Sequence, residues 1–278
     1  MPSVLLRRQG EYHTMKTLHF RGADPYKINT KSIAIVGSRR MTRYGREAVD
    51  KFVCDFVANG ITTISGFMYG IDTEVHQKTI DYGGKTIAVF GCGLDVIYPS
   101  ENKKIYDQII EGGGSVVSEY EDSAKPHLWK FPQRNKIVVS LASFGVLVIE
   151  AGENSGSLVT AKIAKKLGKK IWAVPGPINS KVSVGCNGLI KSGDAIMATS
   201  VNDIVHTKLI NKNEEIRIQN FENKQEEKIY KILEFEALDL DEISQKLSIS
   251  VVEIGSTLSI MGIKGLVTES GGKYYLNK

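Results

Sequence analysis

Six short apolar runs, separated by amphipathic segments, constrain the fold of this chain most strongly. They lie at residues 33–37, 61–65, 85–90, 115–119, 145–150 and 170–175. Each run is rich in β-branched residues and nearly continuous in apolar character, as is typical of strands buried on both faces of a parallel sheet. Helix-like segments fill the crossovers, at 45–59, 71–82, 101–111, 131–141 and 157–167. This alternation predicts an α/β fold with a doubly wound, mostly parallel sheet.

The sequence changes character after Thr207. The stretch 211–225 is polar and charged, which is typical of a linker. The C-terminal segment beyond it has the pattern of three helices, with Asp239 and Ser250 as expected caps, and of a hairpin that turns at Gly271-Gly272. The helices are expected at 226–235, 241–247 and 250–260, and the hairpin at 266–276. We therefore predict a short N-terminal extension (1–31), a large α/β domain (32–210), the linker (211–225) and a small C-terminal winged-helix domain (226–278).

Charge is unevenly distributed along the chain, although the formal net charge is only +5. Residues 1–51 contain eleven Lys and Arg against four Asp and Glu, and residues 151–191 contain seven Lys against one Glu. Residues 226–278, in contrast, contain nine acidic and six basic side chains. The pattern favours a polyanionic partner for the large domain alone. A solvated lysine-rich face would give the same pattern.

The cysteines and the apolar runs exclude several classes of protein. Cys54, Cys92 and Cys186 are far apart and form no Cys-x-x-Cys pair, so we expect neither a metal site nor a disulfide framework. No run of about 18 apolar residues predicts a membrane span. The N-terminus lacks the order of charged and apolar residues found in signal peptides. We therefore expect a cytoplasmic protein that does not contact membranes.

The tripeptide Gly37-Ser38-Arg39 directly follows the first predicted strand. Ligands of open α/β sheets bind at the carboxyl ends of strands. A glycine there allows a phosphate to approach the backbone, the Ser hydroxyl and the N–H groups of the next helix can bind its oxygens, and Arg39 can add a bidentate contact. The dinucleotide fingerprint Gly-x-Gly-x-x-Gly is absent, so we expect no nicotinamide or other cofactor.

A second candidate anion site is Ser155-Gly156-Ser157, which follows the strand ending at Glu150 and opens a helix. Backbone N–H groups at a helix start bind anions, although Ser at this position is also an ordinary helix cap. Between the two sites in sequence, Arg134-Asn135-Lys136 lies near the start of another helix, where it suits phosphate or base contact. The neighbouring Trp129 and Phe131 either stack on bases or pack in the core.

Gly66, after the second predicted strand, again permits close approach of a ligand to the backbone. Asp72 and His76 follow it at a spacing that places both on one face of a helix. They form either an acid–base pair for catalysis or, in the simpler interpretation, a capping carboxylate and a structural histidine.

These segments together resemble the DNA-processing protein A (DprA/Smf) family. The matching segments, in chain order, are IAIVGSR with YG, SGxxYGID with His76, GGKTIAVFGCGLDVIYP, SEY, FPQRNKI, VIEA, SGSLVTA, AVPGPI and GCNGLIKSG. They extend from Ile33 to near Ala198, and the C-terminal segment resembles the winged helix of many members. One departure is Tyr69, where many members carry a basic residue.

The resemblance implies an extended Rossmann-like fold and a homodimeric, non-enzymatic protein of natural transformation (competence) and DNA recombination. Such a protein binds single-stranded DNA, protects it and helps load a RecA-type recombinase. The DNA-contact residues expected from the motifs and the resemblance are Gly37, Ser38, Arg39, Gly66, Arg134, Asn135, Lys136, Ser155, Gly156 and Ser157.

Two alternatives stay open. Related Rossmann-like proteins bind nucleotides or hydrolyse their N-glycosidic bonds, and Asp72, His76 and Glu150 could share a pocket for that reaction, although the PGGxGT-type signature of those hydrolases is absent. Winged helices usually bind duplex DNA through their third helix. Here residues 251–263 contain Glu253 and no Lys or Arg, which favours a protein contact instead.

Overall fold

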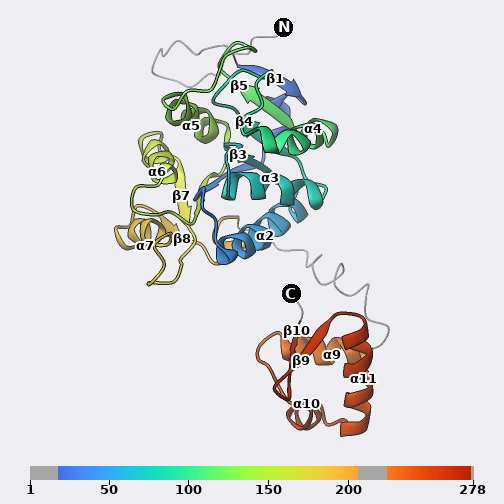
Figure 1. Cartoon of the computed structure of the whole chain (residues 1–278). Helices are drawn as coiled ribbons and strands as arrows, with labels where there is room; N and C mark the ends of the chain where they lie inside the picture. Colours follow the sequence, from blue (N-terminus) through green and yellow to red (C-terminus); the bar gives the residue numbers. More distant parts are fainter. Residues whose placement is uncertain (1–17, 206–223, 277–278) are drawn as a thin grey trace. The chain divides into compact units, whose positions relative to one another are not determined.

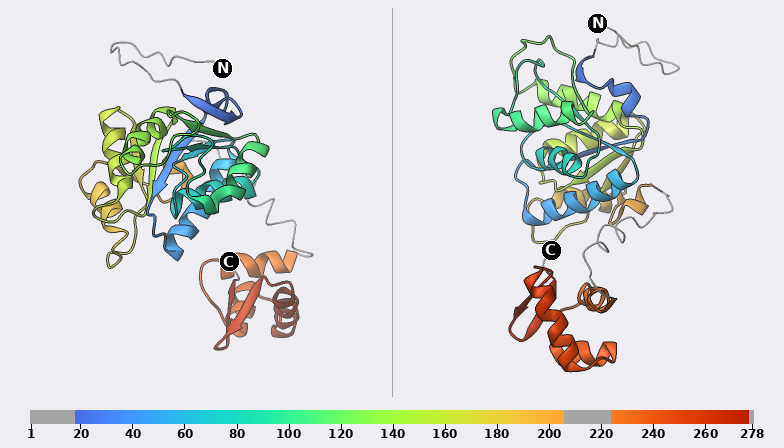
Figure 2. Two further views of the ribbon diagram at one scale, coloured as in Figure 1. Left: turned by 45° about the horizontal axis from the view of Figure 1, so that its top comes forward. Right: turned by 90° about the vertical axis from the view of Figure 1, so that its right-hand side faces the viewer.

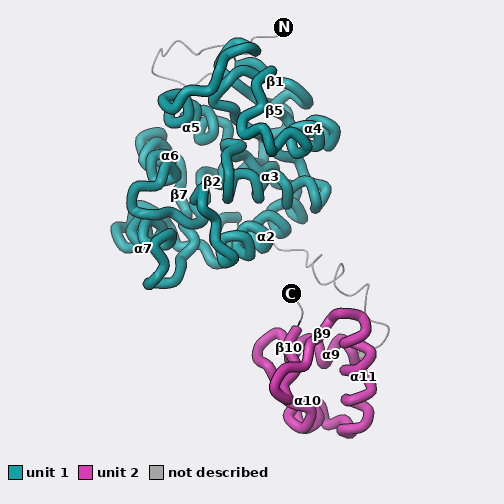
Figure 3. The backbone as a smooth tube through the Cα atoms, viewed as in Figure 1, with its two compact units in different colours: residues 1–208 teal, residues 209–278 magenta. Residues whose placement is uncertain are grey.

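The computed structural model describes residues 18–205 and 224–276, and the chain divides into two compact units, residues 1–208 and residues 209–278 (Figure 3). Among the described residues, unit 1 contains an eight-stranded sheet with the order β1-β5-β4-β3-β2-β6-β7-β8 (Figure 1). All neighbouring strands are parallel except β1, which runs antiparallel to β5. The strands are β1 (His19–Gly22), β2 (Ser32–Gly37), β3 (Thr62–Ser65), β4 (Thr86–Val89), β5 (Ser115–Ser118), β6 (Gly145–Ile149), β7 (Lys170–Ala173) and β8 (Ile196–Met197).

Helices cover both faces of this sheet (Figure 2). On one face α2 packs against α3 and α3 against α4, and on the other face α5 packs against α6. The helices of unit 1 are α1 (Pro25–Ile28), α2 (Arg43–Ala58), α3 (Ile71–Asp81), α4 (Lys103–Glu111), α5 (Lys130–Leu141), α6 (Gly156–Lys166) and α7 (Val184–Lys191). The predicted doubly wound, Rossmann-like α/β fold is confirmed.

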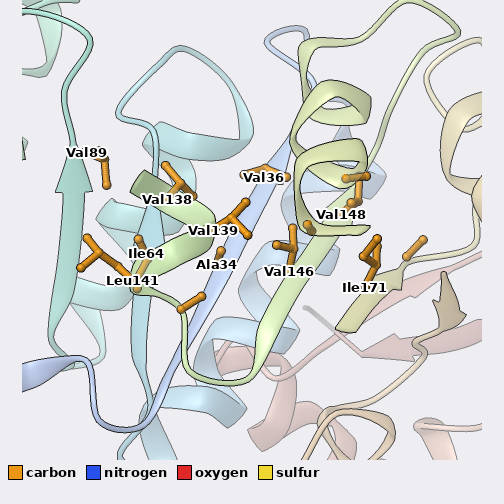
Figure 4. Close-up of a cluster of buried hydrophobic side chains, with 14 of the residues drawn as sticks. Ala34, Val36, Ile64, Val89, Val138, Val139, Leu141, Val146, Val148 and Ile171 are labelled. Atoms are coloured by element: carbon orange, nitrogen blue, oxygen red, sulfur yellow. The ribbon is translucent and has the colours of Figure 1, made fainter. Parts of the chain in front are cut away.

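Successive residues of each strand are buried on opposite faces of the sheet, which explains why the strands appear in the sequence as continuous apolar runs. Val89 and Val117 belong to the cluster beneath α5 and α6, whereas their neighbours Ala88 and Val116 belong to the cluster beneath α4. Successive side chains of a strand point to opposite faces, so both faces must be apolar. Figure 4 shows the first of these clusters, in which Val138 and Val139 of α5 lie against the sheet.

The six predicted strands and five crossover helices are all present, with ends shifted by a few residues. The sequence did not predict the two edge strands, β1 and β8. β1 has the short, mixed sequence HFRG and pairs with β5, with His19 opposite Ser118. Part of the segment predicted as an N-terminal extension, 1–31, therefore contributes a strand to the sheet.

Unit 2 contains three helices and a two-stranded antiparallel sheet among residues 224–276, as the pattern of the sequence predicts. These elements are α9 (Lys224–Leu233), α10 (Leu240–Leu247), α11 (Val251–Ile263), β9 (Val267–Ser270) and β10 (Lys273–Leu276). Asp239 caps α10 by accepting from Glu242 N at 2.8 Å, and Ser250 caps α11 by accepting from Glu253 N at 3.3 Å. The winged-helix assignment stays a prediction, and the predicted linker 211–225 lies outside the described residues except for its last two.

Among the described helices, none taken singly is long and apolar enough to cross a bilayer. α10 and α11 meet the length and composition criterion only when taken together, as a pair bent by 113°.

Candidate nucleic-acid interface

A cavity of about 670 Å³ opens at the carboxyl ends of β2, β3 and β6. The sheet extends from β2 in two directions, through β3, β4 and β5 on one side and through β6 and β7 on the other. The crevice outside such a reversal of strand order is where open α/β sheets bind ligands. The fold therefore places this cavity where a ligand site is expected.

Nine of the ten predicted contact residues lie in the wall of this cavity. They are Gly37, Ser38, Arg39, Gly66, Arg134, Asn135, Ser155, Gly156 and Ser157. They come from segments that are far apart in the sequence and that meet only because parallel strands end at the same edge of the sheet. Lys136 is the exception: it is exposed on α5 but does not line the cavity.

The loop after β2 carries the exposed cations of the site. Arg39 and Arg40 are exposed, and the Arg39 guanidinium lies 5.8 Å from the centre of the Phe131 ring. The loop is held in place by the Ser38 hydroxyl, which accepts from Arg40 N at 3.0 Å, and by the Ser38 carbonyl, which accepts from Ile71 N at 3.1 Å. Two arginine side chains are thus presented at the cavity from a fixed backbone.

The expected anion site at the start of α2 is already occupied by a side chain of the protein. α2 begins at Arg43, and Glu150, at the end of β6, accepts hydrogen bonds from the backbone N–H of Thr42 at 2.9 Å and from its hydroxyl. A carboxylate at a helix amino end satisfies the free N–H groups there. The Thr42 N–H is therefore not available to a phosphate of the ligand, and Thr42 does not line the cavity, whereas Ser38 and Arg39 lie in its wall.

The amino end of α6, in contrast, faces the cavity. Ser155 caps the helix by accepting from Ser157 N at 3.4 Å, and the two hydroxyls are 2.7 Å apart. A Cβ added to Gly156 would meet no heavy atom within 4 Å. Helix α6 therefore presents an uncovered amino end, with two hydroxyl groups, to whatever occupies the cavity.

Arg134 lines the cavity but is only 3% exposed. Its guanidinium Nη1 donates to the carbonyl oxygens of Gly66 and Val89, at the ends of β3 and β4. Burial lowers the pKa of Arg134 to about 10. Burial also raises the pKa of Asp72, against the opposing effect of the Arg134 charge. Arg134 therefore supports the floor of the cavity, a role that the sequence-based assignment as a phosphate contact did not include.

Gly66 has a steric role at this floor. A Cβ at Gly66 would lie 2.5 Å from Asp72 Oδ2 and 2.7 Å from Arg134 Nη2. The absence of a side chain thus lets the strand end approach both groups, which agrees with the expectation that close backbone approach requires glycine here.

The three groups considered for catalysis do not line one cavity. Asp72 does lie in the wall, where its Oδ2 accepts from Met68 N at 3.3 Å. His76 is fully buried, with Nδ1 2.8 Å from Thr86 Oγ1, and burial lowers its pKa to about 3. Glu150 is bonded to Thr42. The contacts of His76 fit the structural interpretation, and the hypothesis of a shared acid–base pocket does not fit. The expectation that Asp72 caps the helix is wrong, because α3 begins after Gly70 without a side-chain cap and Asp72 bonds to the loop before it.

Several further cavity residues were not predicted as contacts. Arg40 and Asn154 adjoin predicted positions, so proximity in the sequence was a sufficient signal. Leu128 and Val182 have no such signal, because only the folding of their loops brings them to the cavity. Tyr69 also lines the cavity, and its hydroxyl lies 3.3 Å from each carboxylate oxygen of Glu101.

Comparison with known proteins identifies the family. The sequence model of the DNA recombination-mediator protein A family matches residues 3–208 of this chain. The chain belongs to this family. The recombination-mediator family assignment agrees with the resemblance carried by the motifs around the cavity.

Curated relatives carry the same family names. DNA processing protein DprA of Streptococcus pneumoniae (strain ATCC BAA-255 / R6) is 42% identical over 173 residues, which are 62% of this chain and 60% of the pneumococcal protein. Protein Smf of Escherichia coli (strain K12) is 39% identical over 181 residues, 65% of this chain and 48% of the relative. The chain thus matches about half the length of these two relatives.

Two solved structures of the recombination-mediator family superpose on this chain. The X-ray structure of DprA from S. pneumoniae gives a TM-score of 0.62 at 40% identity and covers 67% of this chain and 64% of its own. The structure of DNA processing protein A from Helicobacter pylori gives a TM-score of 0.63 at 29% identity. The match covers 70% of this chain and 87% of the H. pylori chain. The H. pylori structure was described for its single-stranded DNA binding mode.

Proposed function

We propose that unit 1 binds single-stranded DNA in the cavity at the carboxyl edge of the sheet, without chemical change to the DNA. The observation that carries this proposal is the convergence of Arg39, Arg40 and the uncovered amino end of α6 on one cavity. Together these groups supply two exposed charges, backbone N–H groups and hydroxyls, which are the usual contacts to phosphates.

The cavity wall also suits the bases or sugars of a strand. Leu128, Pro132 and Val159 are exposed apolar residues in the same wall as the cationic groups. A site that combines phosphate contacts with apolar surface binds single strands with little sequence preference and with a strong dependence on salt. Lys136, exposed on the same helix as Pro132, remains a proposed phosphate contact beside the cavity.

We also propose that this binding protects incoming single-stranded DNA and helps load a RecA-type recombinase during natural transformation, with the protein acting as a homodimer. The family assignment supports this wider role, as does the single-stranded DNA binding described for the H. pylori protein. The proposal concerns unit 1, because that part of the chain is what the family model matches.

Fluorescence anisotropy with a labelled oligo-dT and a duplex of equal length, over a series of salt concentrations, tests the binding proposal. We expect tighter binding of the single strand, and Arg39→Ala should weaken it and flatten its salt dependence by about one counterion. Lys85→Ala is the matched control, since Lys85 is exposed just before β4, at the opposite edge of the sheet. Equal binding by the two variants would contradict the assignment of the cavity.

A further inference from the structure

Trp129 lies beside the cavity with 57% of its surface exposed. It immediately precedes α5, and both the preceding residue, Leu128, and Phe131, two residues further on, contribute to the cavity wall. The other tryptophan, Trp172, is 2% exposed and donates from Nε1 to the Asp203 carbonyl at 3.0 Å. Trp129, unlike Trp172, is therefore a large aromatic ring exposed beside a ligand cavity, and exposed apolar surface of this kind marks a binding site.

The Trp129 ring is held by its neighbours. His127 lies nearly parallel to it, with an interplanar angle of 10° and 6.2 Å between ring centres, and the Tyr120 ring meets it edge-on at 6.5 Å. The Lys130 ammonium lies 5.7 Å from the centre of the Trp129 ring and 4.5 Å from that of Tyr120. A ring fixed in this way loses little conformational entropy when a ligand stacks on it.

The position of Lys130 is itself fixed. Its side chain is buried, and Nζ donates to the Lys125 carbonyl at 2.7 Å. The Lys130 ammonium thus contacts both the Tyr120 and Trp129 rings and the backbone of the loop. Cation–π contacts of this kind orient the ring without covering most of its surface.

The flat face of an aromatic ring suits a base rather than a phosphate as its ligand, because the face carries no hydrogen-bond donor for phosphate oxygens. Stacking on aromatic rings is the common means by which proteins hold successive bases of a single strand.

We propose that Trp129 is a base-stacking subsite just outside the cavity, which holds one nucleobase of the single strand whose phosphates occupy the cavity. This inference rests on the proposed function of the cavity. The Trp129 ring, at the start of α5, would be a second point of contact along the DNA strand, in addition to the phosphate contacts in the cavity.

Intrinsic fluorescence of the full chain tests the subsite, because Trp129 is the exposed one of the two tryptophans. Titration with unlabelled oligo-dT should quench the emission, and an abasic strand of equal length should bind through its phosphates without comparable quenching. If anisotropy reports binding of oligo-dT while the tryptophan emission stays constant, the subsite is wrong and the cavity proposal survives. If no single strand binds at all, both proposals fail.

Affinity provides an independent measurement. Loss of one base–aromatic stack predicts that Trp129→Ala binds oligo-dT at least about fivefold more weakly, whereas Trp129→Phe keeps most of the affinity. The two variants should bind an abasic strand equally. Tyr82→Ala is the matched control, since Tyr82 is a 39% exposed aromatic residue at the far end of α3. Equal affinity of Trp129→Ala and Tyr82→Ala for oligo-dT would overturn the inference. It would also be overturned if Trp129→Ala lost as much affinity for the abasic strand as for oligo-dT, since that result points to a structural effect or to a protein-docking surface.

Discussion

Glu150 accepts a hydrogen bond at Oε2 from the backbone N–H of Thr42, over a distance of 2.9 Å. The contact joins the end of β6 to the start of α2 and so connects the two strands that border the reversal of strand order. Glu150 is 3% exposed, and its backbone has a φ of 54°. A buried carboxylate bonded in this way fixes the geometry of the loop that carries Arg39 and Arg40 and occupies one of the two helix amino ends expected to bind DNA.

Gly45→Ala should disrupt this contact. A Cβ at Gly45 would lie 2.2 Å from Glu150 Oε2, so the helix start and the carboxylate must separate. We expect the free energy of unfolding in urea to fall by about 1–3 kcal/mol. Gly188→Ala in α7 is the control, because a Cβ there meets no atom within 4 Å and should stabilise the helix by about 0.5–1 kcal/mol. Equal stability of the two variants would contradict the described packing.

Arg134→Lys separates structural support from direct DNA contact. Lysine keeps the charge, but its ammonium ends one bond short of the guanidinium Nη1, so it cannot occupy the position from which Nη1 donates to the Gly66 and Val89 carbonyls. We expect the free energy of unfolding to fall by about 2–4 kcal/mol. Arg39→Ala, at an exposed position, should leave thermal stability within experimental error of the unmodified chain. A stable Arg134→Lys protein with weakened DNA binding would mean that Arg134 acts mainly as a phosphate contact.

His76 should make the stability of unit 1 sensitive to acid. Burial lowers the pKa of His76 to about 3 in the folded chain, against an ordinary value of 6.5. The unfolded chain therefore binds a proton between these two values that the folded chain does not bind, and stability is lost as the pH falls through that interval. The contribution is on the order of 1 kcal/mol per pH unit. Urea denaturation at several pH values should show a shallower acid loss in His76→Gln than in the unmodified chain, and parallel curves would contradict the buried, neutral histidine.

The strands of the sheet could be predicted because burial on both faces leaves a direct signal in the sequence. Ile33, Ala34, Ile35 and Val36 of β2 are all buried, so these four consecutive positions are apolar. β1 lacks that signal, since a partly buried edge strand such as HFRG has no need of continuous apolar residues. β8 is only two residues long, and both are exposed, so no periodicity can emerge from it.

The position of the site could be predicted from the ends of the strands, but the roles of individual residues could not. Ser155 and Gly156 follow a strand and open a helix, and that local order is enough to place them at the cavity. The burial of Arg134 depends on carbonyl groups 68 and 45 positions away in the chain. Glu150 and Thr42 are likewise separated by 108 positions. Pairings of this kind arise from the tertiary fold and leave no local pattern.

The most direct test of the account is the affinity of Gly156→Asp for single-stranded DNA. Gly156 is the first residue of α6 and has open space for a side chain, so the carboxylate should leave stability unchanged or raise it by about 0.3–1 kcal/mol through the helix dipole. The same carboxylate lies where a phosphate would bind. Gly188→Asp makes the identical change of charge outside the cavity, also in open space. We predict that Gly156→Asp binds oligo-dT at least about tenfold more weakly than Gly188→Asp at equal thermal stability. Equal affinities of the two variants would show that single-stranded DNA does not bind in this cavity.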